Sequence, residues 1–390
     1  KLRLFITIKM KRNICVISSS RADYNHLFVL MKKLQASRKL KLSVIVTGMH
    51  TLKEYGYTLK EIKEDGFKID EVIKTHQLDT SKRSILLSMS EQLKKAYSSI
   101  QRIKPDLIVV LGDRYDMYPI VLTAHIMNIA IAHLHGGEVT SGVLDDGFRH
   151  SVSKLSHLHF VAHNDFKKRL IRMGEDKKNI YNVGSLGVDA INNLKFNSKK
   201  IILSKYKIPL DKKYLVICVH PETVQGNNKT LIQNILKSLQ EFSNYHKVFT
   251  YPNSDTDSRI ILNDITKFVK KDNNSQIIKS SGRHDFLHLL KYSECLIGNS
   301  SSGIVECPIL GTPTVNIGKR QNGRPRTSSI LDTKSTVANI TKNIFLAIKY
   351  QKKKLTPNYV GTNSVGKILE VLSSVNLESL VDKNFVDYKM

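Results

Sequence analysis

Apolar and polar residues follow one another along this chain in a pattern that predicts strands and helices in alternation. In the first half, short apolar runs predict buried strands at 13–19, 42–46, 67–73, 106–111, 129–134, 158–162 and 180–183. Segments with helical spacing predict helices at 21–34, 52–64, 84–103, 119–127 and from 188 onward. Continuous apolar strands that alternate with helices are typical of a parallel sheet covered on both faces. We therefore expect a Rossmann-like domain over 10–195.

The pattern lapses into Lys, Ser, Asn and Pro between 195 and 211, which favours a linker there. A second alternating unit follows and predicts another Rossmann-like domain over 211–372. Its expected strands lie at 214–219, 247–251, 276–279, 294–297 and 314–317, and its expected helices at 229–242, 258–268, 286–292, from 303, 337–350 and 365–375. We expect residues 373–390 to pack back on the N-terminal domain. Two doubly wound α/β domains that face a central cleft bind ligands beyond the carboxyl ends of their strands.

Charge changes this picture only slightly. The chain has 61 Lys and Arg residues against 34 Asp and Glu residues, a formal net charge of +27, but the lysines are scattered over its whole length. Tryptophan is absent, and neither an RNA-binding signature nor zinc-finger spacing occurs. We therefore expect no nucleic-acid partner, and a positive field that favours small anionic substrates.

Cysteine usage and hydropathy indicate the compartment. Cys15, Cys218, Cys295 and Cys307 each lie in or beside an apolar run, without a CxxC pair, which favours buried free thiols in a reducing environment. No apolar run approaches the length that spans a bilayer. We expect a cytoplasmic protein with no membrane partner.

The stretch LIGNSSSGIVE at 296–306 is the most informative candidate site. An apolar run stops at Gly298, small polar residues follow, and helical spacing starts at Gly303. Such a turn directs backbone amides and serine hydroxyls at an anion, and suits a diphosphate. Glu306 lies one helical turn further and could bind the two hydroxyls of a ribose. Alternatively, Asn299 and the serines only cap the helix, and Gly303 only relieves crowding.

Histidines and carboxylates gather between 133 and 159. His133 and His135 are expected on one face of a strand end, with Glu138 beyond two glycines. Asp145, Asp146, Arg149, His150, His157 and His159 follow. Paired histidines with aspartates raise a metal-dependent hydrolase as an alternative, yet acid–base chemistry on a sugar needs the same residue types.

Other expected strand ends also carry ionisable or polar groups. Arg21 follows the first strand in SSSRADY, and Asp113 and Arg114 follow another in LGDRYD. His220 begins HPET, and Asn253 lies in YPNSD. Together with the GKRQNGR segment at 318–324, these groups supply cations and hydrogen-bonding groups around one cleft.

These residues resemble a family, the hydrolysing UDP-N-acetylglucosamine 2-epimerases of sialic and legionaminic acid biosynthesis, which have a GT-B fold. The resemblance runs from about 13 to 384. It rests on SRADY (20–24), TGMH (47–50), GDRYD (112–116), HLHGGEVT (133–140), DDGFRH (145–150), KLSHLHF (154–160), YPNSD (251–255), GNSSSGIVE (298–306) and KRQNGR (319–324).

The resemblance implies roles for individual residues. We expect the UDP-sugar to contact Arg21, Arg114, His220, Asn253, Ser301, Ser302, Gly303, Glu306 and Arg320. We expect the chemistry to involve Asp113, His135, Glu138, Asp145, Asp146 and His220. The reaction implied is elimination of UDP through a 2-acetamidoglucal, followed by addition of water that releases a free manno-configured sugar. It requires neither a cofactor nor a metal, and the family implies a homodimer or homotetramer.

His135 departs from part of the family, because some relatives carry Glu at this position, whereas bacterial members can keep His. Either His135 or Glu138 then transfers the proton. The change also fits a branch that acts on UDP-N,N'-diacetylbacillosamine instead of UDP-N-acetylglucosamine. A non-hydrolysing epimerase and a GT-B glycosyltransferase are the alternative functions.

Overall fold

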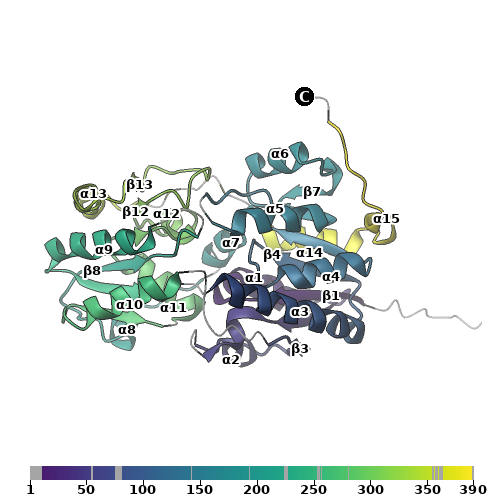
Figure 1. Ribbon diagram of the computed structural model, residues 1–390, viewed down its shortest axis with the longest axis horizontal. Helices are drawn as coiled ribbons and strands as arrows, with labels where there is room; N and C mark the ends of the chain where they lie inside the picture. Colours follow the sequence, from purple (N-terminus) through teal and green to yellow (C-terminus); the bar gives the residue numbers. More distant parts are fainter. Residues whose placement is uncertain are drawn as a thin grey trace, which may run out of the picture.

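The chain folds into two α/β domains, each built on a parallel sheet with helices on both faces (Figure 1). The computed structural model describes residues 11–53, 56–74, 81–141, 143–192, 194–223, 227–252, 255, 257–279, 281–353, 355, 359 and 363–388. The strand order within each sheet reverses direction next to the first strand of its domain, as in doubly wound folds. The expected GT-B-like fold is confirmed.

The N-terminal sheet has seven strands in the order β3-β2-β1-β4-β5-β6-β7. The strands are β1 (Arg12–Ser18), β2 (Leu40–Val46), β3 (Glu71–Val72), β4 (Leu107–Leu111), β5 (Ala130–Leu134), β6 (Leu158–Val161) and β7 (Ile180–Asn182). The helices are α1 (Arg21–Gln35), α2 (Leu59–Glu64), α3 (Lys82–Ile103), α4 (Tyr118–Ile126), α5 (Asp145–Leu155), α6 (Asn164–Arg172) and α7 (Leu186–Asn192), with 3-10 turns η1 (Gly48–Thr51) and η3 (Lys177–Asn179). Alternate residues of β1 enter opposite cores, Ile14 with Leu27 and Cys15 with Ile120.

The C-terminal sheet has six strands in the order β10-β9-β8-β11-β12-β13. They are β8 (Tyr214–Cys218), β9 (His246–Thr250), β10 (Ser275–Ile278), β11 (Leu296–Gly298), β12 (Thr314–Ile317) and β13 (Ile330–Thr333). The helices are α8 (Lys199–Lys205), α9 (Asn228–Leu239), α10 (Ser258–Val269), α11 (Gly282–Tyr292), α12 (Glu306–Leu310) and α13 (Val337–Lys349), with 3-10 turns η4 (Gln240–Phe242) and η5 (Ser301–Gly303). Two further helices, α14 (Ser364–Ser374) and α15 (Glu378–Val381), end the fold.

Several elements differ from the expectation. The helix expected over 52–64 begins only at Leu59. The helix expected from Gly303 is a 3-10 turn followed by α12, which starts at Glu306 and ends at Gly311, a left-handed residue. The segment 195–211, expected to be a linker, contains α8, because Ile202 and Leu203 pack in a core of the C-terminal domain.

The chain returns to the N-terminal domain earlier than residue 373. Val365, Ile368 and Leu372 of α14 are buried in the same core as α1, so the crossing lies before α14 (Figure 1). The tail that follows runs along α5: Lys383 donates hydrogen bonds to the carbonyl oxygens of Lys154 and Ser156 at 2.7 and 2.6 Å. This lysine therefore caps the carboxyl end of α5.

Two further observations concern burial. All four cysteines are buried and unpaired. Within the described ranges, no helix combines the length and the apolar character that a membrane span requires.

Candidate active site

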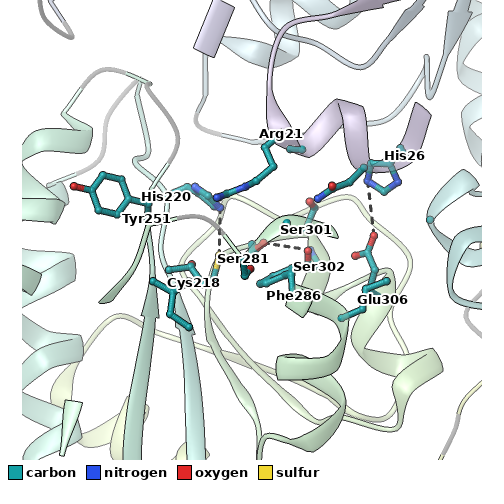
Figure 2. A pocket seen from close by; sticks show the side chains of 18 of the residues that line it. Arg21, His26, Cys218, His220, Tyr251, Ser281, Phe286, Ser301, Ser302 and Glu306 are labelled. Carbon is teal, nitrogen blue, oxygen red and sulfur yellow. Dashed lines mark hydrogen bonds and ion pairs between the residues drawn. The ribbon is translucent and has the colours of Figure 1, made fainter. Parts of the chain in front are cut away.

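Two adjoining pockets lie where the carboxyl ends of both sheets face each other. We call the first the serine pocket, because Ser300, Ser301 and Ser302 line it together with Arg21 of α1 (Figure 2). We call the second the carboxylate pocket, because its walls hold five acidic groups. These are Asp23, Asp113, Glu138, Asp145 and Glu306. Five residues line both pockets: Ala22, His26, Ser301, Glu306 and Arg320.

The serine turn owes its shape to close backbone packing. Gly298, with φ at +140°, ends β11, and a Cβ atom here would lie 2.0 Å from the carbonyl oxygen of Cys218. Asn299 then clamps the neighbouring strand, accepting from the backbone N–H of His220 at 2.7 Å and donating to its carbonyl oxygen at 2.8 Å. Gly303 lines neither pocket, and an added Cβ would meet Thr314 at 2.5 Å. Asn299 and Gly303 thus shape the turn, and the three serines line the serine pocket. The contact expected between Gly303 and the substrate stays a prediction.

The expected cations do reach the serine pocket. Arg21 extends from α1 across the cleft and donates to the carbonyl oxygen of Lys279 at 3.0 Å. Arg320 is buried and donates to the carbonyl oxygen of Asn299 at 3.3 Å. His220 lines the same pocket, and burial, together with Arg320 and Arg21, lowers its pKa well below the ordinary value. The imidazole of His220 is therefore neutral between two guanidinium groups, while Asn253 lies outside the described residues.

Glu306 lies where the two pockets join. Burial raises its pKa to about 7, although a hydrogen bond with Ser302 opposes the shift. Its Oε1 atom is 3.8 Å from Nε2 of His26, which extends from α1 (Figure 2). This carboxyl group can be protonated near neutral pH.

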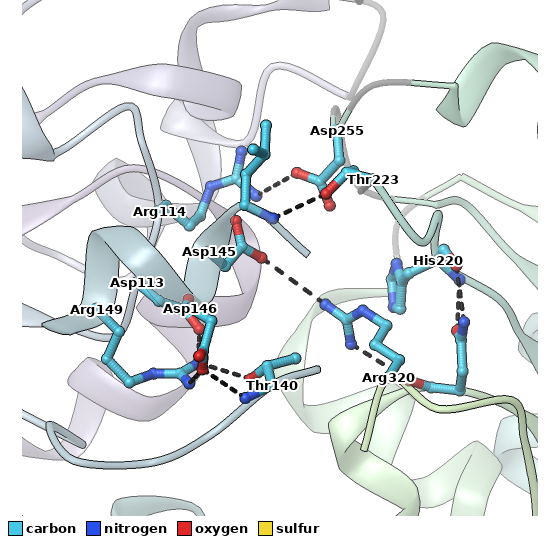
Figure 3. A network of polar contacts seen from close by, with 12 residues as sticks. Asp113, Arg114, Thr140, Asp145, Asp146, Arg149, His220, Thr223, Asp255 and Arg320 are labelled. Carbon is cyan, nitrogen blue, oxygen red and sulfur yellow. Dashed lines mark hydrogen bonds and ion pairs between the residues drawn. The ribbon is translucent and has the colours of Figure 1, made fainter. Parts of the chain in front are cut away.

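The carboxylate pocket holds two aspartates in different environments (Figure 3). Asp113 forms an ion pair with Arg149, a buried side chain of α5. Burial and the neighbouring Asp255 raise the pKa of Asp145 to about 7, against the opposing effect of Arg114 and Arg320. Asp113 is thus paired with a guanidinium group, whereas Asp145 can carry a proton near neutral pH.

Asp146 lies beside this pair without lining either pocket. Its Oδ1 accepts from the backbone N–H of Thr140 at 2.7 Å and lies 3.4 Å from Arg149. It therefore fixes the turn after Glu138 to the start of α5.

His135 and Glu138 form a histidine–carboxylate pair in the same pocket. Nδ1 of His135 lies 3.0 Å from Oε1 of Glu138, whose Oε2 lies 2.9 Å from Arg324. Burial disfavours the Glu138 carboxylate, but Arg324 and His135 outweigh this and lower its pKa to about 2. Nε2 of His135 is buried and has no hydrogen-bond partner among the described residues. His135 also has φ at +63°, a backbone strain that is common at functional sites.

Arg114, which was expected to contact the substrate, lines the carboxylate pocket and also pairs with two aspartates. It contacts Asp116 within its own domain at 3.0 Å and Asp255 of the opposite domain at 3.2 Å (Figure 3). The backbone N–H of Leu144 donates to the Thr223 hydroxyl at 2.9 Å beside this pair. These contacts join the two domains over the carboxylate pocket.

The structure does not support the metal site considered from the sequence. His133 binds the carbonyl oxygen of Gly112 at 2.7 Å, and the positive φ of His135 turns that side chain elsewhere, so the two histidines do not share a face as expected. His157 accepts the backbone N–H of Ile131, and His159 pairs with Glu175 at 2.9 Å. Throughout the described part of the chain, no three His, Cys, Asp or Glu residues group as metal ligands.

No role was assigned from the sequence to His26, Arg149, Asp255 or Arg324, which the structure brings into this site. Arg149, Asp255 and Arg324 lie within the DDGFRH, YPNSD and KRQNGR motifs, so those motifs were the available signal. His26 becomes significant only once the two domains face each other.

Comparisons with known proteins agree on one family. The family described as UDP-N-acetylglucosamine 2-epimerase matches residues 32–373. The GDP/UDP-N,N'-diacetylbacillosamine 2-epimerase (hydrolyzing) of Campylobacter jejuni is 37% identical over 387 residues, which cover 97% of this chain and 99% of that protein. Polysialic acid biosynthesis protein P7 of Escherichia coli is 37% identical over 323 residues, 82% of each chain. A UDP-N,N'-diacetylbacillosamine 2-epimerase (hydrolyzing) of Legionella pneumophila is 33% identical over 95% of this chain and 98% of its own.

A solved structure has the same fold at low sequence identity. The UDP-GlcNAc 2-epimerase of Neisseria meningitidis, bound to UDP-GlcNAc, superposes with a TM-score of 0.78 at 18% identity, over 92% of this chain and 99% of that chain. At this identity, the likeness concerns the fold alone.

Proposed function

The chain belongs to the UDP-N-acetylglucosamine 2-epimerase family, and we propose that it is a hydrolysing member that converts a UDP-linked 2-acetamido sugar into UDP and a free sugar inverted at carbon 2. The observation that carries this proposal is the His135–Glu138 pair. Both residues line a pocket that adjoins a turn of three serines, and Nε2 of His135 has no hydrogen-bond partner among the described residues. Proton transfer at a sugar carbon beside an anion-binding turn is what such a reaction requires.

Among such sugars, we propose UDP-N,N'-diacetylbacillosamine as the preferred substrate. Two relatives, 37% and 33% identical over nearly the whole chain, carry that sugar in their names. UDP-N-acetylglucosamine is the alternative, because relatives at 33% identity and below carry its name.

In the first step, we assign proton removal from carbon 2 to His135. Glu138 accepts a hydrogen bond from Nδ1–H and so leaves the lone pair of the imidazole at Nε2. Arg324 keeps Glu138 ionised, which strengthens the orienting bond. UDP leaves from carbon 1 as the double bond of the 2-acetamidoglucal forms.

The remaining carboxyl groups have separate roles in this proposal. Asp113, which pairs with Arg149, can stabilise the positive charge that develops at carbon 1. Asp145, with its pKa near 7, can exchange a proton with water or with carbon 2 when water adds to the glucal. Inversion at carbon 2 needs proton delivery to the face opposite the one that lost its proton, and two separate acid–base groups meet that need.

The serine pocket is the proposed site of the UDP portion. Arg21 and Arg320 supply positive charge for the diphosphate, and Ser301 and Ser302 supply hydroxyl donors. Glu306 lies beside Ser302, within reach of a ribose bound in that pocket.

The test is proton NMR in deuterated water with chelator-treated protein and each of the two UDP-sugars in turn. We expect UDP and a free manno-configured sugar with deuterium at carbon 2, formed faster from UDP-N,N'-diacetylbacillosamine. Return of an epimerised UDP-sugar without free sugar would identify a non-hydrolysing epimerase instead. No consumption of either sugar until a divalent metal is added would contradict the proposal.

A further inference from the structure

His26 occupies the boundary between the two pockets. It extends from α1, five residues after Arg21, and lines both the serine pocket and the carboxylate pocket (Figure 2). A ligand with its diphosphate in one pocket and its sugar in the other has the bond between them at this boundary. His26 therefore lies beside the bond that a UDP-sugar must break.

Three neighbours fix the position of the His26 ring. Glu306 lies 3.8 Å from its Nε2 atom, and the ring of His135 lies 5.7 Å away between centroids. Gly187 at the start of α7 backs the pair: an added Cβ there would lie 2.8 Å from Cε1 of His26 and 2.8 Å from Oε1 of Glu306. The glycine thus leaves room for the imidazole and the carboxyl group to lie side by side.

The surroundings of His26 are polar rather than apolar. Its side chain is 26% exposed, which is more than a core histidine would be. The carboxyl group of Glu306 lies 3.8 Å from its Nε2 atom. The ring can therefore present an N–H donor to an anion at the boundary.

From this placement, we propose that His26 is a further catalytic residue, which donates a hydrogen bond from its imidazole N–H to the β-phosphate oxygen that leaves carbon 1. This inference rests on the proposed function. In that step, the bond between carbon 2 and hydrogen breaks and the proton passes to His135. The electron pair forms the double bond between carbons 1 and 2, and the bond between carbon 1 and oxygen breaks with its electrons on the phosphate. His26 stabilises the charge gained by that oxygen.

The two rings divide the elimination between them. His135 serves carbon 2 and His26 serves the oxygen on carbon 1, and a spacing of 5.7 Å between the rings suits groups that act on neighbouring carbon atoms. The addition of water to the glucal breaks no bond to phosphate, so it does not need His26. The two half-reactions should therefore respond differently to loss of this side chain.

The experiment compares these half-reactions in the full-length protein. For the His26→Gln variant, we expect release of UDP from the UDP-sugar to fall about 100-fold, the loss typical of removing one donor to a developing oxyanion. We expect hydration of the 2-acetamidoglucal, supplied directly together with UDP, to stay within about threefold of the wild-type rate. His125→Gln, on the exposed face of α4, is the matched control and should change neither rate.

Two further variants test the assigned chemistry. His26→Lys keeps a cationic donor and should recover at least about a tenth of the wild-type rate of UDP release. Gly187→Ala should displace the pair and slow the elimination selectively. Equal losses in both half-reactions of His26→Gln, or a loss in His26→Lys as deep as in His26→Gln, would overturn the proposal. Wild-type protein that consumes no UDP-sugar would contradict the proposed function itself.

Discussion

Nδ1 of His135 donates a hydrogen bond to Oε1 of Glu138 at 3.0 Å. The backbone of His135 has a left-handed conformation that few non-glycine residues adopt. His135 lines the carboxylate pocket, and its Nε2 atom has no hydrogen-bond partner among the described residues. We therefore propose that His135 transfers the proton. Glu138, held as a carboxylate by its ion pair with Arg324, orients the imidazole ring of His135.

Replacing His135 by Gln should therefore lower kcat by about 100- to 1000-fold, the usual contribution of a positioned acid–base group. UDP release from the preferred sugar measures the rate. Affinity for UDP, measured by calorimetry, should change by less than about threefold, because His135 lines the carboxylate pocket and not the serine pocket. A variant with full activity would remove His135 from the mechanism.

Asp113→Asn should abolish turnover and leave UDP binding largely intact. The substitution keeps the shape of the side chain but removes the charge that pairs with Arg149 and that faces the developing positive charge at carbon 1. Single-turnover assays and UDP titration separate the two effects. If the variant retained full activity, Asp113 would have no part in the chemistry.

Ser302→Ala should mainly weaken UDP binding, by about 1 kcal/mol or roughly five- to tenfold in Kd, the worth of one hydrogen bond. Ser328→Ala, an exposed serine on the same domain, is the matched control. An unchanged UDP affinity in Ser302→Ala would leave the serine turn with only its capping role.

Asp145 should make stability depend on pH. Its pKa is raised from an ordinary value near 3.8 to about 7, so the folded protein binds more protons at this site than the unfolded chain between these values. The free energy of unfolding therefore loses this contribution as pH rises from about 4 through 7. Asp145→Asn removes the buried charge and should raise Tm at pH 8 relative to wild type, with a smaller difference at pH 5, as measured by calorimetry. A difference of equal size at both pH values would show that the carboxyl group does not titrate in this window.

Most strands could be predicted from the sequence, because each is a continuous apolar run. Strand β13 was not expected, since only Ile330 and Leu331 of its four residues are apolar, and β3 covers only Glu71–Val72 of the strand expected over 67–73. The helix α5 could not be predicted, because its buried positions include Asp145 and Arg149, so the polar groups that form the pocket interrupt the apolar spacing. These residues were identified from the sequence as part of a cluster of ionisable groups, but the helix on which they lie was not predicted. Helix α12 was expected too early, because the 3-10 turn of the serines precedes its first residue, Glu306.

Contacts across the cleft could not be predicted from the sequence, for a different reason. Arg114 and Asp255 are 141 positions apart, and local spacing holds no information about a pair that exists only when two domains meet. The substrate contact expected of Arg114 stays a prediction, whereas its ion pair with the opposite domain was not expected. The proximity of His26 on α1 to Glu306 on α12 could not be predicted for the same reason.

The return of α14 to the first core has a consequence for synthesis on the ribosome. Ile368 and Leu372 complete the layer that covers α1, and they are translated after the whole C-terminal sheet. Domains generally fold as units in the order in which they emerge. Here the first domain to emerge is the last to close its core, so a nascent chain carries an uncovered apolar face on α1 until about residue 380 is available.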